Sequence, residues 1–184
     1  MPLGAARFGL LGGVADLGKL ELIETQTSTA GTTAFDFTDL GSYNVHFITY
    51  NNFTATSAET NVCLRFSNDG GSSYISTGYQ YATQLARVGT FIEGKSTNSA
   101  FLGFGAQMNT STNGSGYWYC YNLLDSSKYS FATQQCICNQ NTVFSKFGSG
   151  VLPTAETHNA LQVTLNTDSI VAGGVVSLYG IAES

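Results

Sequence analysis

Residues 169–184 read SIVAGGVVSLYGIAES and carry an alternating, apolar segment almost to the end of the chain. In an extended conformation Val176 and Leu178 lie on one face, and Val175, Ser177 and Tyr179 lie on the other. In a jelly roll the first and last strands commonly lie side by side in one sheet. We therefore expect this segment to be an integral strand, and its removal to prevent folding.

The same period-two alternation recurs along the whole chain, whereas helical periodicity is nearly absent. Twelve segments alternate in this way, and from them we expect about ten or eleven strands at the spacing typical of an antiparallel sandwich or barrel. Pro2 and Pro153 are the only prolines, and both lie outside these segments, which fits because proline removes a ladder donor. The segments that carry the pattern are LELIETQT, TAFDFTDL, YNVHFITYNNF, NVCLRFS, YISTGYQYATQ, GTFIEGKS, AFLGFGAQM, YWYCYN, KYSFATQQCICNQ, NTVFSKF, ALQVTLN and VVSLYGI.

Residues 68–73, NDGGSS, separate two alternating runs. Asp-Gly-Gly in that position favours a hairpin, because glycine adopts a positive φ at little cost. The preceding run should point Val62, Leu64 and Phe66 inward and Arg65 outward. Asp69 has a second interpretation as a calcium ligand, although stabilisation of the turn by its own side chain is the commoner reason for Asp there.

Composition narrows the possible functions. The chain has 184 residues, of which 42 % are hydrophobic and only 10 % charged, and its net charge is −5. That length suits one domain, and the acidic balance argues against nucleic-acid binding, which needs a basic face. The sequence contains no apolar run of transmembrane length. The four cysteines are interpreted as buried free thiols, with disulfide pairing left open: Cys63, Cys120, Cys136 and Cys138.

Residues 1–18 differ from the rest and are predicted to form an extended N-terminal arm, with the sandwich domain at 19–184. The segment is too rich in glycine for a good helix and too apolar to be stable in water. It is either an arm that docks on a partner or an extra strand laid on its own sandwich. The apolar residues that would make the partner contact are Leu3, Phe8, Leu10, Leu11 and Val14.

No motif for catalysis, phosphate binding or dinucleotide binding is present, and we expect neither enzyme activity nor a metal or other cofactor. His46 lies within an apolar strand and is interpreted as structural. His158 follows TAET and is predicted to lie in a solvated loop.

Aromatic residues are abundant, with ten Tyr, twelve Phe and one Trp. The runs YQY at 79–81 and YWYCY at 117–121 place tyrosines on a common strand face. Facing inward they would belong to the core, and facing outward they could pack on another subunit or stack on a sugar. The residues that could contact a glycan are Asn109, Asn113, Tyr117 and Trp118.

Four stretches together resemble a family of small virion proteins from tailed phages, especially marine and cyanobacterial ones. They are MPLGAARFGLLGG at the start, VCLRFSNDGGSSYISTGYQY, YNLLDSSKYSF, and SLYGIAES at the end. The resemblance covers residues 20–183, and its motifs are structural rather than catalytic. The motif positions are Arg65, Asp69, Gly70, Tyr79, Lys128, Tyr129, Leu178, Tyr179 and Gly180.

The resemblance implies a single jelly-roll β-sandwich built into a phage particle that is assembled in the host cytoplasm. The first function it implies is capsid decoration, in which a homotrimer cements the shell and the arm binds the major capsid protein or another virion protein. The alternative is a fibre module that recognises a glycan or other receptor on the host surface. Neither function involves nucleic acid or insertion into a membrane.

Overall fold

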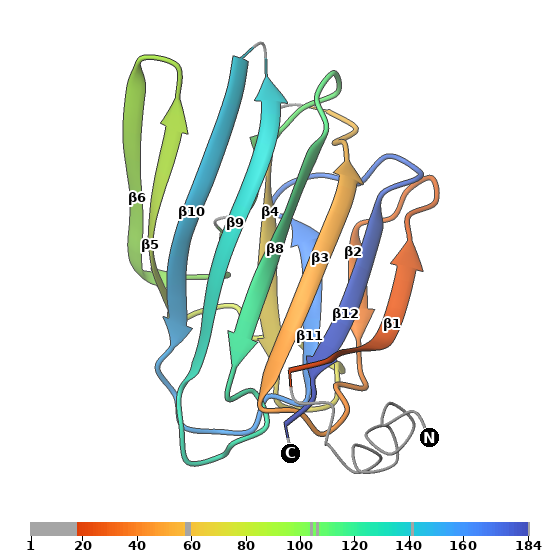
Figure 1. The fold of residues 1–184 in the computed structure, drawn as a ribbon, viewed down its shortest axis with the longest axis vertical. Coiled ribbons are helices and arrows are strands. Elements are labelled where there is room, and N and C mark those ends of the chain that lie inside the picture. Colours follow the sequence, from red (N-terminus) through yellow and green to blue (C-terminus); the bar gives the residue numbers. More distant parts are fainter. Residues whose placement is uncertain (1–17, 58–59, 104, 106, 141, 184) are drawn as a thin grey trace, which may run out of the picture.

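The computed structural model describes residues 18–57, 60–103, 105, 107–140 and 142–183. This part of the chain is all β, and it forms two antiparallel sheets that face each other as a sandwich (Figure 1). Its strands are β1 (Leu20–Thr27), β2 (Ala34–Phe37), β3 (Val45–Phe53), β4 (Thr60–Ser67), β5 (Tyr79–Arg87), β6 (Thr90–Ser99), β7 (Gln107–Met108), β8 (Gly114–Tyr121), β9 (Ser130–Gln140), β10 (Thr142–Leu152), β11 (Ala160–Leu165) and β12 (Val175–Ile181).

The two sheets differ in size. The larger has eight strands in the order β1-β12-β3-β8-β9-β10-β5-β6, and the smaller has four in the order β2-β11-β4-β7. Figure 1 shows the smaller sheet behind the half of the larger sheet that consists of β1, β12, β3 and β8, whereas β10, β5 and β6 extend beyond the smaller sheet. Four pairings are nested in the sequence, because β1 pairs with β12, β2 with β11, β3 with β8 and β4 with β7.

Alternation along each strand builds the core between the sheets. On β3 the inward residues are His46, Ile48 and Tyr50, all fully buried, and on β8 Trp118 is buried beside Tyr50, with ring centroids 4.8 Å apart. On β4 the inward residues Val62, Leu64 and Phe66 are buried as expected from the sequence, and Arg65 points the other way. The buried side chains form one continuous cluster, as a two-layer domain requires.

The closing strand is integral to the larger sheet, as its sequence predicts. β12 lies between β1 and β3 and pairs with both along its length. Val176 and Leu178 are fully buried, and Tyr179 points to the opposite face. Gly180 completes the fit, because a Cβ there would overlap the ring of Tyr43.

The hairpin predicted at 68–73 is wrong. β4 belongs to the smaller sheet and β5 to the larger, so the Asp-Gly-Gly turn begins a connection between sheets. The Asp69 carboxylate accepts hydrogen bonds from Ser67 Oγ and from the backbone and hydroxyl of Ser73. These bonds close the turn locally and lower the pKa of Asp69 to about 2. Across the layers, the Phe66 amide donates to the Tyr79 hydroxyl.

Two further expectations need correction. The sequence predicts a strand over residues 100–108, but among the described residues of that stretch strand pairing is limited to β7 and to a bridge between Leu64 and Leu102. His158, expected to be solvated, is fully buried.

His46 is buried, and its Nε2 lies 2.8 Å from the Leu40 carbonyl oxygen. All four cysteines are buried free thiols. None of the described segments is a helix that could cross a membrane.

Candidate binding surface

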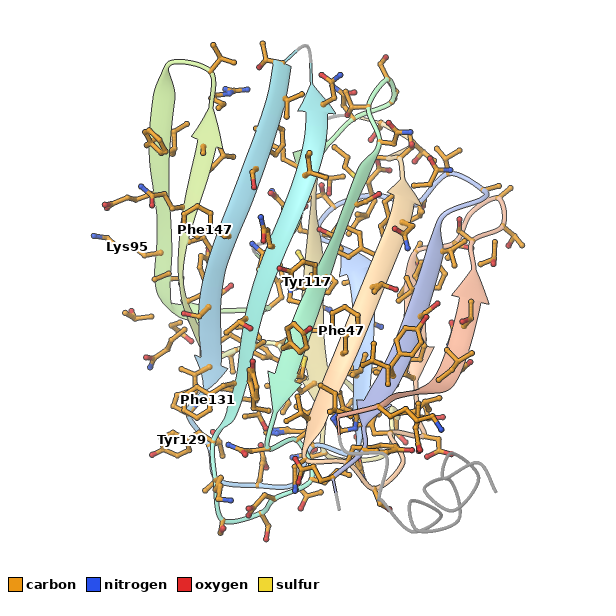
Figure 2. All side chains as sticks on the ribbon, in the orientation of Figure 1. Phe47, Lys95, Tyr117, Tyr129, Phe131 and Phe147 are labelled. Carbon is orange, nitrogen blue, oxygen red and sulfur yellow. The ribbon has the colours of Figure 1, made fainter. Side chains whose placement is uncertain are left out.

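The larger sheet has one face that no described element covers, which we call the outer face. It is the side turned away from the smaller sheet and toward the reader in Figures 1 and 2. Antiparallel sheets with one solvated face usually carry polar and charged side chains on it. Here the outward positions instead include many apolar side chains. The exposed large apolar residues at outward positions are Leu20, Leu22, Phe91, Phe131, Ile137, Val143 and Phe147.

The outer face also lacks charge over most of its width. On β1, β12, β3, β8, β9, β10 and β5, no outward side chain of the described residues is charged. Glu93 and Lys95 are the outward charges of the sheet, and both lie on the edge strand β6. Depletion of charge together with exposed aromatic residues is the composition of an interface core.

Cross-strand pairing arranges the outer face in rows. Two rows run across all eight strands, and we name each by one member. The Phe47 row, from β1 to β6, is Leu22, Tyr179, Phe47, Tyr119, Thr133, Ser149, Ala82 and Lys95. The Tyr117 row is Thr25, Ser177, Thr49, Tyr117, Gln135, Phe147, Gln84 and Glu93.

The β12-β3-β8 part of the face carries a cluster of aromatic rings in tilted or edge contact, which we call the aromatic ridge. Phe47 lies at its centre, with ring centroids 4.7 Å from Tyr119, 5.8 Å from Tyr117 and 6.1 Å from Tyr179. Tyr117 is further oriented by its hydroxyl, which donates to Gln135 Oε1 at 2.9 Å. Rings held in this way are rigid, and they lose little conformational entropy when a partner packs on them.

The other half of the face is hollowed into an outer groove of about 670 Å³. Its floor carries the small side chains of Ala82, Ser149 and Thr133, and Phe131 and Lys95 also line it. Figure 2 shows Phe131 near one end of β9 and Lys95 on β6, on either side of β5 and β10. The face therefore combines a cluster of aromatic rings on β12, β3 and β8 with a groove that has small side chains from β9, β10 and β5 in its lining.

The structure separates the residues proposed for glycan contact. Tyr117 lines a second hollow of about 460 Å³ with Thr49 and Gln135, and Asn113 lines an adjoining one of about 400 Å³. Asn109 lies in the β7–β8 turn, where its Oδ1 accepts from the Ser111 amide. Trp118 is fully buried on the opposite face, so it cannot contact a surface ligand. The prediction that Trp118 contacts a glycan is therefore wrong.

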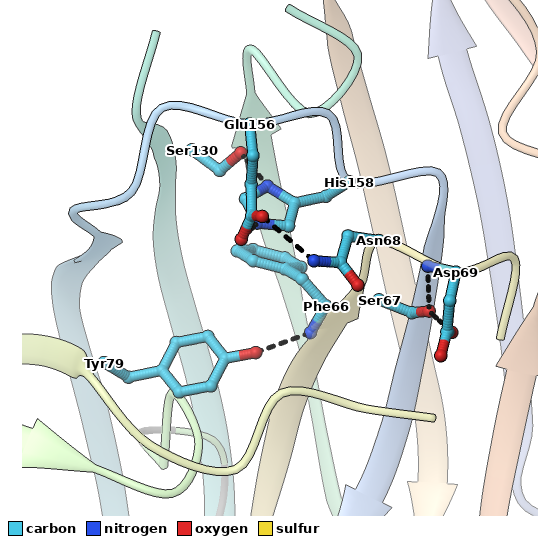
Figure 3. A network of polar contacts seen from close by, with 8 residues as sticks. All are labelled: Phe66, Ser67, Asn68, Asp69, Tyr79, Ser130, Glu156 and His158. Carbon is cyan, nitrogen blue, oxygen red and sulfur yellow. Dashed lines mark hydrogen bonds and ion pairs between the residues drawn. The ribbon is translucent and has the colours of Figure 1, made fainter. Parts of the chain in front are cut away.

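A Ser-His-Glu arrangement joins the connection between β10 and β11, which carries Glu156 and His158, to Ser130, the first residue of β9 (Figure 3). His158 Nδ1 lies 2.7 Å from Ser130 Oγ, and its Nε2 lies 3.2 Å from Glu156 Oε1. The ring also packs on Phe66 with centroids 5.4 Å apart. Ser130 and His158 are both fully buried, so no substrate reaches the hydroxyl. The arrangement ties the connection after β10 to the start of β9.

Sequence reasoning missed the apolar residues of β9 and β10 on the outer face, Phe131, Ile137 and Phe147. The available signal was that both faces of these segments carry apolar residues, which indicates a strand covered on both sides. The predicted arm residues Leu3, Phe8, Leu10, Leu11 and Val14 lie outside the described residues.

The outer face has the shape and composition for non-covalent contact. In the part of the chain that the structure describes, no group of three or more His, Cys, Asp or Glu side chains is placed to hold a metal ion. Comparison of the chain with protein-family models, with curated proteins and with solved structures finds no match.

Proposed function

We propose that this chain is a structural subunit of a phage particle, assembled in the host cytoplasm, whose role is to contact other proteins. The outer face, where the described residues place charges only on the edge strand β6, carries this proposal, because an apolar face of that kind is stable in water when another surface covers it. The resemblance of four sequence stretches to virion proteins of tailed phages names the kind of particle.

The nested pairings support a jelly roll as the architecture of this subunit. A long antiparallel hairpin that rolls up pairs its first strand with its last and continues inward. The pairs β1–β12, β2–β11, β3–β8 and β4–β7 follow that order and divide four and four between the sheets. The β5–β6 and β9–β10 strand pairs are then insertions that widen one sheet and enlarge the outer face.

Capsid decoration is the function that we favour, with the arm at 1–18 as the contact to the shell. Each apolar side chain that the arm buries would contribute about 1.5–3 kcal/mol before ordering costs. The test adds purified protein to undecorated shells of the phage that encodes it. The full chain should bind to saturation, and a chain that lacks residues 1–18 should stay folded and soluble but unbound. Full occupancy by the truncated chain would contradict the role of the arm.

Recognition of a host-surface glycan is the second candidate, and the hollows beside Tyr117 favour it. A tyrosine ring flanked by Gln135 and Thr49 combines a stacking surface with hydrogen-bonding groups. A glycan array with the whole protein tests this function, with Tyr117→Ala as the probe and Tyr121→Ala, near the other end of β8, as the matched control. Loss of a saturable signal in the first variant alone supports glycan binding, and the absence of any signal with the unaltered protein contradicts it.

A further inference from the structure

The size of the outer face sets the kind of partner that can cover it. With neighbouring strands about 4.8 Å apart and a rise of about 3.3 Å per residue, the sheet spans roughly 34 Å across its strands and about 25 Å along them. The resulting area of roughly 850 Å² is close to the 800 Å² or so that each partner buries in a stable protein–protein interface. A protein surface of similar size therefore fits this face.

The chemistry of the face narrows the partner further. A covering surface that carried charges would lose their hydration and find no opposite charge on seven of the eight strands. The partner surface must therefore be uncharged except at its margin, partly apolar and of the same extent. The outer face of a second copy of this chain has these properties.

The three inner positions on each side of the Phe47 row are complementary in size. Tyr119, Phe47 and Tyr179 occupy β8, β3 and β12, whereas the positions at equal distances on the other side of the sheet centre are Thr133, Ser149 and Ala82. The sheet centre lies between β8 and β9, with four strands on each side. A rotation that exchanges the halves thus places large side chains over small ones.

We propose that two copies of this chain pack outer face to outer face, related by a two-fold axis that runs parallel to the strands between β8 and β9. The axis places the aromatic ridge of each copy in the outer groove of the other. Phe47 then lies over Ser149 of the partner copy, Tyr179 over its Ala82 and Tyr119 over its Thr133. The inference rests on the proposal that the chain is a subunit of an assembly, and it names the partner that covers the outer face.

The Tyr117 row agrees with the same axis. In this row the large side chain lies on β10 and the small one on β3, which is the opposite of the Phe47 row. Its large residue on the β10 side is Phe147, and the position related by the axis is Thr49, which is small. Tyr117 lies opposite Gln135 of the partner copy, a side chain that it already contacts within its own chain. Where β3 of one copy lies over β10 of the other, β3 therefore supplies the large side chain in one row and β10 supplies it in the next. Faces that interdigitate show this alternation.

The symmetry also limits the assembly. A two-fold contact is isologous, so both copies use the same patch and the pair is closed. The expected species is a dimer of twice 19.5 kDa, and this differs from the trimer that the resemblance implies. The mass of the isolated full-length protein, measured by light scattering at about 100 µM, distinguishes the two. A monomer or a trimer at that concentration would overturn the proposal.

Substitutions across the axis test the pairing itself. Ser149→Arg places a charge under the ring of Phe47 from the partner copy and should weaken the dimer by about 100-fold or more. Ser42→Arg, in the exposed loop between β2 and β3, is the matched control and should leave the mass unchanged. A dimer that tolerates Ser149→Arg contradicts the proposal.

A charge pair supplies the reciprocal test. Phe47→Glu alone should also dissociate the dimer, whereas Phe47→Glu combined with Ser149→Arg should restore it, because each Glu then faces an Arg of the partner copy. Within one chain the two positions lie three strands apart, about 14 Å, so restoration reports contact between copies. If both single variants are monomeric and the double variant is too, the proposed pairing is wrong.

These measurements use protein without shells or glycans, so they do not depend on the outcome of the decoration test. A dimer that fails to decorate shells would contradict the proposed function and leave this inference standing. A monomer that decorates shells would support the proposed function and contradict the dimer.

Discussion

His158 shows how a single buried side chain makes the fold sensitive to pH. Burial lowers its pKa from the ordinary value of 6.5, and the nearby Glu156 carboxylate partly opposes that shift. The neutral ring is the form that the folded protein favours. Between the lowered pKa and 6.5 the unfolded chain binds more protons, so stability is highest above about 6.5 and falls as the pH drops below it.

We therefore expect the free energy of unfolding, measured with urea between pH 7.5 and 5, to decrease toward acid pH. Glu156→Gln should steepen the decrease, because it removes the carboxylate that stabilises the protonated ring. His158→Gln should flatten it, leaving the part contributed by His46, whose pKa is also lowered by burial. Identical pH profiles for all three proteins would show that His158 does not titrate in this way.

Two adjacent glycines in the turn after β4 offer a matched comparison. Gly70 and Gly71 both have positive φ, 73° and 87°. A Cβ on Gly70 would meet open space, whereas one on Gly71 would lie 2.8 Å from Thr38 Cγ2. We expect Gly70→Ala to cost about 1–2 kcal/mol of stability, and Gly71→Ala to cost about 1–3 kcal/mol more. Urea denaturation measures both, and equal costs would contradict the close packing of this turn.

At the scale of elements, β12 is the strand on which the larger sheet depends. It lies between β1 and β3, so its loss would leave ladder groups unpaired on both neighbours and remove Val176 and Leu178 from the core. A chain that ends at residue 174 should fail to fold, with loss of the far-ultraviolet β signal and of soluble protein. Removal of residues 183–184 alone is the control and should preserve the fold. A folded product without β12 would contradict this role.

The sequence predicts single strands better than it predicts their partners. Alternation located β3, β4, β8 and β12, because one buried face imposes a period of two on each. The turn at Asp69 shows where local reasoning ends, since the same Asp-Gly-Gly chemistry closes a hairpin or begins a crossing between sheets. The choice depends on which sheet the next strand joins, and contacts distant in the sequence decide that.

The same limit applies to the candidate surface of the whole molecule. Tyr117 could be proposed from its strand pattern, but Trp118 was placed with it although the two point to opposite faces. The outer face, with its charges confined to β6, could not be predicted, because it becomes apparent only when the pairing places β9 and β10 between β8 and β5. Phe47 and Ser149 share a row although they are about a hundred residues apart in the sequence.

The composition of the outer face leads to a prediction for the whole molecule. Salt weakens contacts between exposed charges, since the screening length falls to a few ångströms near 1 M salt. The proposed dimer interface has charges only on β6, at its margin, so its dissociation constant should change less than about threefold between 50 and 500 mM NaCl. Sedimentation equilibrium at both salt concentrations measures this ratio, with Phe47→Glu combined with Ser149→Arg as the salt-sensitive control. If raising the salt weakens the unaltered dimer more than tenfold, the copies meet through charged edges, because a contact through the outer face has no charge pair for salt to screen.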